Sequence, residues 1–595
     1  MPKNNVQTKN SGKWRDADIA RWVLFGILCL AGAVFLIWKA HYGYGNRDES
    51  FYLTIPKRLV QGDALIAGEW HVSQLSGFLL YPLMYIYMLF NPSFEGAILH
   101  FRIFYVLFQL LCAVFLFWRL QRISKPVSVI APLFFMLYAP FNIMAMSYNS
   151  LGIGFFALAT VTFITVKDGI SLRRQLLNYA LAGVFFACAV LCCPYLAVLY
   201  FLYLFAVLIA QLVYRLRHKA CDRQSVLSFV TLLGLTAGVA VMAVLFLLFV
   251  FTRSSPSKVI AAIPQIMNDP EHSKFSLLPT LKKFGRYVIR SNTLAKWCYI
   301  ATGVLTLAAL FDRKSRHRRA VYFVLAAAVT VVYALGFRKN PYINYLMMPL
   351  NLLGLISFFL CEKRPWKVFL AMFVPTLLYA YAVSASSNQG FYVISSVFSV
   401  GCICSIYFIY SFLSGYDGKQ ARLFGWVAQG AGIVAFAVVL VFAMQIRATD
   451  TFWDSDVAEL NVKIESGVNR GIITRESFKN SSDTALADTA DIRAIPEGNV
   501  LYFSKNTALY LMDEKRNAAF SAWMSIGDMK KSQINRALTR LKAYYEINPE
   551  KIPDVIYIDM SKEADAQNVP EQLGLEGTLT KCGSGYVFYR EGGKK

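Results

Sequence analysis

An acidic pair, Asp48-Glu49, follows the first long apolar run of the chain. A carboxylate at the boundary between lipid and water can have a raised pKa, and it can then accept a proton from a hydroxyl group. Asp48 could act as such a base, with Glu49 orienting a substrate or pairing with Arg47. Asp48 could equally be the cap of a helix that starts at Glu49. The residue types alone leave both roles open.

The elements that must position this pair are membrane spans. The chain of 595 residues is 56% hydrophobic and 16% charged, and its mean hydropathy is +0.45, which is too apolar for one water-soluble core. Apolar runs of bilayer length have to be helices, because backbone amides in lipid must pair within their own segment. We expect about thirteen such spans, near residues 21–40, 99–118, 126–145, 150–166, 176–192, 195–214, 226–251, 294–311, 319–337, 342–361, 367–384, 391–413 and 422–446.

The net charge of +24 lies mainly in short loops between these runs, which argues against a nucleic-acid partner. If residues 1–20 are cytoplasmic, every second loop is basic, as the positive-inside rule requires. The basic loops contain Arg119, Arg122 and Lys125; Arg173 and Arg174; Arg215, Arg217 and Lys219; Arg313, Lys314, Arg316, Arg318 and Arg319; Lys363, Arg364 and Lys367; and Lys419 and Arg422. An odd number of spans then places residues 447–595 on the extracytoplasmic side.

One apolar stretch, Leu75–Phe90, is nearly long enough to span but would reverse every later loop if it did. Its three tyrosines and Pro82 suit the headgroup region better than the bilayer centre. We therefore expect an interfacial helix within one large outer loop, residues 41–99, that carries the acidic pair. A second outer loop runs from Thr252 to about Asn292.

Residues 447–595 are predicted to form a small soluble α/β domain. Strand-like segments at Asn499–Ser504, Pro553–Asp559 and Gly585–Tyr589 are interleaved with a helical stretch near Lys530–Tyr545. The polar run 480–483 is typical turn material. This domain contains a single cysteine, so it has no internal disulfide framework.

The order of residues around the acidic pair resembles the first outer loop of the GT-C glycosyltransferases that use polyprenyl-phosphate sugars. Protein O-mannosyltransferases and lipid A aminoarabinose transferases are members of this group. The matching residues are Asp48-Glu49, Tyr52, the stretch Leu53–Val60, Gly62-Asp63, Leu80-Tyr81-Pro82-Leu83 and Arg102. A second match, Arg338-Lys339-Asn340-Pro341-Tyr342 with Pro349 further on, resembles the family segment that contacts the donor phosphate.

Two positions depart from the family pattern. The segment Ser147-Tyr148-Asn149-Ser150 stands where many relatives carry a second Asp, and Cys192-Cys193-Pro194 lacks a Lys that several relatives place at that turn. A role for a second acid, or for a lysine at this turn, therefore does not carry over to this chain.

The resemblance implies a GT-C-like fold and an inverting transfer of a sugar from a polyprenyl-phosphate donor to a glycan, lipid or protein acceptor in the envelope. Asp48 would be the base, with Glu49 beside it. Because a departing phosphate needs cations to stabilise its charge, the donor phosphate would be bound by Arg338, Lys339, Arg102 and Tyr342. Lys57 and Arg58 are secondary candidates that could instead snorkel to lipid headgroups.

The predicted substrate groove contains Tyr52, Trp70 and His71. Trp70 could stack on a sugar face or anchor the loop in the interface, and the sequence does not separate these roles. The outer residues His41, Asp63, Glu69, His71 and His272 form no metal-ligand spacing, so no cofactor is expected and a divalent metal has no support.

Two other functions suit a polytopic membrane protein. A transporter or flippase of lipid-linked saccharides should keep ionisable residues inside its spans, and these spans contain almost none. A non-enzymatic membrane scaffold would leave the acidic pair unexplained. Few cysteines outside the spans, and the single sequon Asn480-Ser481-Ser482, favour a bacterial plasma membrane.

Overall fold

The computed structural model is mostly helical, with one small mixed sheet near the C-terminus. The predicted fold class, a polytopic α-helical membrane protein with a small C-terminal α/β domain, is confirmed. The described residues are 6–167, 169–218, 226–269, 277–290, 292–311, 315–338, 343–386, 390–416, 422–524, 526 and 529–593.

Among the described residues, ten helical segments are long and apolar enough to cross a membrane. All ten coincide with predicted spans. They are α1 (Val6–Ala40), α4 (Ala97–Leu120), α7 (Leu172–Cys192), α8 (Ala197–His218), α9 (Phe229–Phe251), α12 (Thr293–Phe311), α13 (Arg316–Phe337), α15 to α16 (Trp366–Val368 and Val374–Ser386, joined by a π-helical turn), α17 to α18 (Phe391–Ile394 and Phe398–Leu413) and α19 (Arg422–Thr449). The chain is therefore an integral membrane protein.

The other three predicted spans are shorter apolar helices: α5 (Lys125–Leu137), α6 (Tyr148–Ile164) and α14 (Asn344–Leu360). The prediction for residues 126–145 was too long. The chain leaves the helix after Leu137, and Phe141 and Asn142 take positive φ angles of 59° and 61°. Only a few side chains tolerate that conformation, and it cannot continue a helix.

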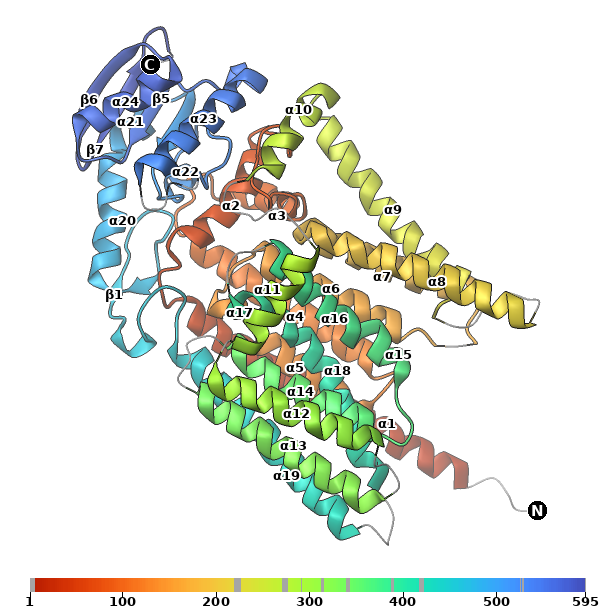
Figure 1. The fold of residues 1–595 in the computed structure, drawn as a ribbon. Helices are drawn as coiled ribbons and strands as arrows, with labels where there is room; N and C mark the ends of the chain where they lie inside the picture. Colours follow the sequence, from red (N-terminus) through yellow and green to blue (C-terminus); the bar gives the residue numbers. More distant parts are fainter. Residues whose placement is uncertain are drawn as a thin grey trace.

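Helices α7 and α9 pack against each other through glycines. A Cβ on Gly238 would lie 1.9 Å from the carbonyl oxygen of Ala180, and one on Gly183 would lie 2.2 Å from that of Leu235. Gly234 and Gly238 form the small-residue spacing that lets two apolar helices approach closely without a hydrophobic driving force. Helix α7 also packs along α6, and α8 extends away from the rest of the bundle (Figure 1).

Residues 41–96 form what we call the first loop. It contains α2 (Asn46–Val60) and α3 (Ser76–Phe90), in the region where an interfacial helix was predicted. Gly77 of α3 faces Ile55 of α2, and the ring of Phe78 contacts Phe246 and Phe249 of α9. The region predicted as a second loop contains α10 (Pro256–Met267) and α11 (Leu277–Arg290).

The tail domain, which follows α19, has a five-stranded sheet. Its strand order is β4 (Arg516–Asn517), β3 (Asn499–Phe503), β5 (Val555–Ile558), β7 (Gly585–Arg590) and β6 (Gly577–Cys582). Strand β3 is parallel to β4 and β5, whereas β7 is antiparallel to β5 and β6. The helices are α20 (Glu476–Asp488), α21 (Ala490–Ala494), α22 (Leu509–Met512), α23 (Lys531–Ile547) and α24 (Glu563–Leu573). The three predicted strands and the predicted helix are confirmed.

The polar run 480–483 was predicted to be a turn but lies inside α20, so that prediction was wrong. Phe478 and Ala485 pack on the two neighbouring cores from one side of this helix. Lys479 and Asp483, one turn apart on the helix, form an ion pair. These contacts outweigh the weak helix propensity of Asn and Ser.

The tail domain is joined to both ends of the first loop by backbone hydrogen bonds. Strands β1 (Val462–Lys463) and β2 (Ile473–Thr474) form a hairpin. The amide of Gly43 donates to the carbonyl of Ile473, and the amide of Gly96 donates to the carbonyl of Gly467. The tail domain therefore lies over the first loop, at the end of the helical bundle opposite the N-terminus (Figure 1).

Candidate functional site

A cavity of about 480 Å³ lies between the first loop, the ends of several apolar helices and the tail domain. Its wall comes from parts of the chain that are far apart in sequence. The first loop contributes Arg47, Asp48, Tyr52, Val72 and Ser73; the helix ends contribute Phe141, Tyr148, Asn149, Cys192 to Tyr195, Tyr379, Val383, Tyr392 and Val393; and the tail side contributes Phe452, Trp453 and Trp523. Its volume is within the usual range of small-molecule sites.

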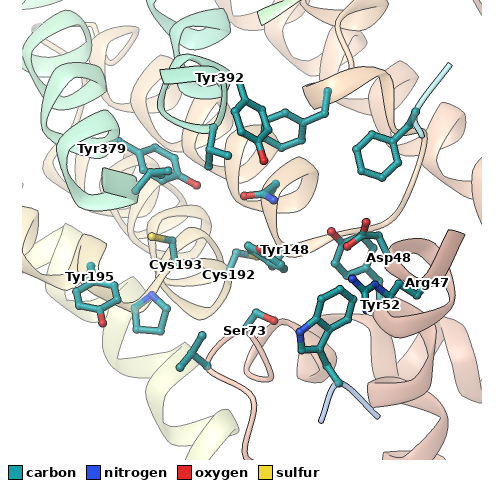
Figure 2. A pocket seen from close by; sticks show the side chains of 18 of the residues that line it. Arg47, Asp48, Tyr52, Ser73, Tyr148, Cys192, Cys193, Tyr195, Tyr379 and Tyr392 are labelled. Carbon is teal, nitrogen blue, oxygen red and sulfur yellow. The ribbon is translucent and has the colours of Figure 1, made fainter. Parts of the chain in front are cut away.

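Asp48 faces this cavity from the first turn of α2 (Figure 2). The helix starts at Asn46 with Gly45 as its N-cap, so the alternative in which Asp48 caps a helix starting at Glu49 is wrong. Burial raises the pKa of Asp48 to about 6, and repulsion from Glu49 adds to this, whereas Arg47 and a hydrogen bond from Trp453 lower it. Among the described residues, the Asp48 carboxylate has no ion-pair partner.

Glu49, the other half of the acidic pair, points away from the cavity. Its Oε1 accepts a hydrogen bond of 2.8 Å from Nε of Arg102, and its Oε2 accepts another from the same guanidinium. Arg102 also donates to the carbonyls of Ala40, Tyr42 and Gly43. Neighbours on a helix point about 100° apart, which is why two adjacent carboxylates have such different surroundings.

The structure gives Arg102 a different place from the one the resemblance implied. Its side chain is 6% exposed and all its nitrogens are used in holding Glu49 and the chain between α1 and α2. Arg102 does not line the cavity. It stabilises the first loop and is not available to bind a phosphate. Among the described lining residues, the guanidinium that reaches the cavity is that of Arg47, which lies 4.7 Å from the ring centroid of Trp523.

Aromatic side chains make up much of the remaining wall. Tyr52 meets Tyr148 edge to face, with ring centroids 5.7 Å apart, and Tyr379 and Tyr392 lie across the cavity from the first loop (Figure 2). Tyr52 was predicted as a groove residue, and the cavity contains it. Such rings can stack on the faces of sugars and can offer a hydroxyl group at the edge.

The two positions that depart from the family pattern both line this cavity. Tyr148 and Asn149 start α6, where Ser147 caps the helix in a reciprocal pair of hydrogen bonds with Ser150. Cys192 and Cys193 end α7 on the neighbouring wall. The alignment of sequence order with the family singled out these positions. Their residue types alone did not predict that they would line the same cavity as Asp48.

Trp70 was predicted to line the groove or to anchor the loop in the interface, and its position fits neither role. Its side chain is 0% exposed and packs against Phe520 and Tyr544 of the tail domain. His71 is half-buried, with its ring against Phe51 and its Nδ1 2.7 Å from Oγ of Ser73. His71 is therefore adjacent to the cavity through Ser73 and does not line it.

Lys57 and Arg58 do not snorkel to lipid, because both are buried beneath the tail domain. Lys57 donates to the carbonyls of Tyr510, Leu511 and Asp513. Arg58 pairs with Asp63 and Glu69, at 2.8 Å in each case. These two cations fix the tail domain on α2 and are not available to a substrate.

The second predicted phosphate-binding segment is described only in part. Arg338 is exposed at the end of α13, and Lys339 and Tyr342 lie outside the described residues. Asn344, two positions after Tyr342, accepts a hydrogen bond from the backbone of Phe141 and donates one to the carbonyl of Tyr392. Both of these residues line the cavity, so Asn344 lies directly beside it.

No group of three or more His, Cys, Asp or Glu side chains in the described part of the chain is arranged to hold a metal ion. Of the outer residues considered for a metal, His272 lies outside the described residues. Asp63 and Glu69 are both paired with Arg58, and His71 contacts Ser73.

Comparison with known proteins gives one type of match. No protein-family model and no curated protein matches the chain. Among solved structures, the chain is similar to a crystal structure of the Archaeoglobus fulgidus oligosaccharyltransferase, tethered to an acceptor peptide containing the NVT sequon. The sequences are 12% identical, the match covers 96% of this chain and 74% of the other, and the TM-score is 0.42.

Proposed function

We propose that this protein is a membrane glycosyltransferase that moves a sugar from a polyprenyl-phosphate donor to a hydroxyl group of a glycan, lipid or protein acceptor. The reaction inverts the anomeric carbon in one displacement. It takes place at the extracytoplasmic face of what we propose is a bacterial plasma membrane. The cavity that contains Asp48 is the proposed active site.

The observation that carries this proposal is the environment of Asp48. Its carboxylate faces a cavity of about 480 Å³, has no ion-pair partner among the described residues, and has a pKa raised to about 6 by burial. A general base works best when its pKa lies near the working pH, because it is then deprotonated and still takes up a proton readily. A structural carboxylate at this position would be expected to be paired, as Glu49 is.

The transfer step uses Asp48 as the base. The acceptor hydroxyl gives its proton to the Asp48 carboxylate while its oxygen forms a bond to the anomeric carbon. The bond from that carbon to the phosphate oxygen breaks, and the electron pair leaves with the phosphate. Holding the two reactants in line within one cavity supplies much of the rate gain.

The departing phosphate needs positive charge but no strong acid. Arg47 is the arginine that the described cavity wall offers, and it is held over the ring of Trp523. Arg338, Lys339 and Tyr342 remain proposed as phosphate contacts from the segment that precedes Asn344. A donor carried on a lipid suits a cavity formed at the ends of apolar helices, since nucleotide sugars are scarce outside the cytoplasm.

The extracytoplasmic placement rests on the charge pattern. Short basic loops fall at every second connection between the spans, and the acidic pair and the tail domain fall on the other side. The N-terminus and the tail domain lie at opposite ends of the bundle, as this alternation requires (Figure 1).

The test is a transfer assay with the full chain in proteoliposomes and radiolabelled polyprenyl-phosphate sugars. Asp48→Asn keeps the shape of the side chain but removes the base, so transfer is expected to fall by about 10²- to 10⁴-fold. Lys339→Ala is expected to lower transfer as well, through loss of phosphate stabilisation. The anomeric configuration of the product, determined by NMR, tests inversion.

Asp565→Asn is the matched control, because Asp565 is exposed on α24 of the tail domain and lines neither of the large cavities. It should transfer at the wild-type rate. Full turnover by Asp48→Asn would remove Asp48 from the mechanism. If no lipid-linked donor supports transfer while the protein moves lipid-linked saccharide across the bilayer, the chain is a transporter, and if it does neither, a scaffold role takes the place of the enzyme.

A further inference from the structure

A second cavity, of about 360 Å³, lies at the other end of α2. It is formed by the chain after α2, the corner between α9 and α10, and the tail domain. It shares no lining residue with the cavity of Asp48 among the described residues. Twelve residues of helix separate Asp48 from the end of α2, which places the two cavities roughly 20 Å apart.

The second cavity has more positive than negative charge. Its described wall contains four cations, Arg253, Lys258, Arg516 and Lys551, and two acids, Asp63 and Glu550. Both acids are already neutralised, because Glu550 accepts from Lys258 at 2.6 Å and Asp63 accepts from Arg58 and Lys551. The excess charge therefore belongs to Arg253 and Arg516, neither of which has a carboxylate partner among the described residues.

Part of the wall of this second cavity consists of buried polar side chains. Asp63 is 7% exposed, Lys551 is 9% exposed and Asn548 is 4% exposed. Asn548 is fixed by its hydrogen bond to the carbonyl of Ala67. Hydroxyl groups from Ser254 and Ser255 lie beside these charges. Lys551 and Asn548 already have partners, so these buried groups fix the shape of the wall, and the contacts to an anion fall to Arg253 and Arg516.

Arg253 places one side of the cavity at the lipid surface. It follows α9 by two positions, and its guanidinium lies 3.8 Å from the ring centroid of Phe249 and 4.7 Å from that of Tyr81. Aromatic residues at the end of a span mark the headgroup level. An anion that reaches Arg253 from the membrane would carry its charge at that depth.

We propose that this second cavity binds the phosphate group of an anionic phospholipid. The headgroup phosphate lies between Arg253 and Arg516, with its acyl chains along the surface of α9 and α3. The lipid joins three separate parts of the molecule, namely the end of α2, the α9–α10 corner and the tail domain. This binding does not depend on sugar transfer, because the site is distinct from the one that contains Asp48.

The test measures binding to the full chain in neutral detergent, with no sugar donor present. Short-chain dioctanoyl phosphatidylglycerol is titrated while the thermal midpoint is recorded, and dioctanoyl phosphatidylcholine and glycerol 3-phosphate are titrated in parallel. The anionic lipid is expected to raise the midpoint in a saturable way. The zwitterionic lipid and the headgroup without chains are expected to shift it far less.

Two variants locate the site, and a third is the control. Arg253→Gln and Arg516→Gln each remove one charged contact and should weaken the anionic lipid about tenfold. Arg516 is exposed on β4, so its variant tests the site even if Arg253→Gln folds poorly. Arg536→Gln removes an equal charge from the exposed face of α23, outside the cavity, and should bind as the wild type does.

Each contrary result overturns the proposal. Unchanged affinity in Arg516→Gln means that the lipid binds elsewhere. Equal binding of phosphatidylcholine removes the selectivity for an anion, and equal binding of glycerol 3-phosphate shows that a soluble phosphate, not a lipid, is the ligand. If Arg536→Gln binds the anionic lipid as weakly as the other two variants, the loss of affinity reflects net charge and not this cavity.

Discussion

At the scale of single residues, two neighbouring carboxylates have opposite surroundings. Glu49 is buried in an ion pair with Arg102, which holds it within the structure of the first loop. Asp48 faces an open cavity, and burial raises its pKa to about 6. Separating the environments of paired acids in this way is how proteins assign them different tasks.

The raised pKa of Asp48 predicts the acid limb of the pH–rate profile. A base must be deprotonated, so kcat/KM is expected to rise with pH up to about 6 and to level off above it. Arg47 lowers this pKa by attraction to the carboxylate. In Arg47→Gln the same limb should therefore move to higher pH, in addition to any fall in rate.

The measurement is kcat/KM for transfer between pH 4.5 and 8 in the wild type, Arg47→Gln and Arg536→Gln. The last variant removes a distant arginine and should keep the wild-type profile. A limb at the same pH in all three proteins would mean that a group other than Asp48 titrates.

Sequence alone singled out Asp48, Tyr52 and the two departing segments, all of which line the cavity, because the order of residue types along the first third of the chain was informative. It misplaced Trp70, Arg102, Lys57 and Arg58. Trp70, Lys57 and Arg58 are buried by tail residues about 450 positions away, such as Asp513 and Tyr544. A local sequence pattern contains no information on contacts between residues so far apart in the chain. It therefore predicts that these side chains are exposed.

At the scale of helices and strands, the spans were predicted well because bilayer length imposes a strong pattern. The failures have local causes. Helix α5 ends early where the backbone takes positive φ angles, and α20 forms despite a polar, turn-like sequence because one side of it packs on the bundle and the sheet. A hydropathy pattern predicts neither the early end of α5 nor the packing of α20.

The contact between α7 and α9 gives a prediction at this scale. In Gly238→Ala the new methyl group would meet the carbonyl of Ala180, so the helices must separate. Overpacking of this kind costs about 1–3 kcal/mol. The thermal midpoint of the purified protein is expected to fall.

Gly303→Ala is the matched control, because a Cβ at Gly303 of α12 meets no atom within 4 Å. It should leave the midpoint unchanged or raise it slightly, since alanine costs less chain entropy in a helix than glycine. If Gly238→Ala matches this control, the close approach of α7 and α9 does not contribute to stability.

At the scale of the whole molecule, the tail domain is part of the proposed active site. Its Trp523 lies over Arg47, and the segment that leads into it contributes Phe452 and Trp453 to the same cavity. The α/β class of this domain was predictable from its alternating strands and helix. Its position over the first loop was not, since that depends on side chains from both ends of the chain.

Trp523→Ala tests this arrangement. Loss of the ring frees the Arg47 guanidinium and opens the cavity, so kcat/KM for transfer is expected to fall about tenfold, in line with the loss of a cation–π contact. The thermal midpoint should change little, because Trp523 is half-buried at the surface of its domain.

Trp297→Ala is the corresponding control, because Trp297 is 61% exposed on α12 and does not line the cavity. Its kcat/KM should equal that of the wild type. An equal loss in both variants would show a general effect of removing tryptophan and would separate the tail domain from catalysis.

The backbone bonds between the β1–β2 hairpin and the ends of the first loop have a consequence for biosynthesis. The hairpin leaves the ribosome roughly 360 residues after the first loop, which at about 5–20 residues per second is a delay of roughly 20–70 s. During that interval the first loop lacks its hairpin partner, and the residues that later cover Arg58 and Trp70, Phe520 and Tyr544, are made later still. A nascent or prematurely terminated chain would therefore insert into the membrane with the proposed active site incomplete, so that the proposed activity begins only after the tail domain has folded.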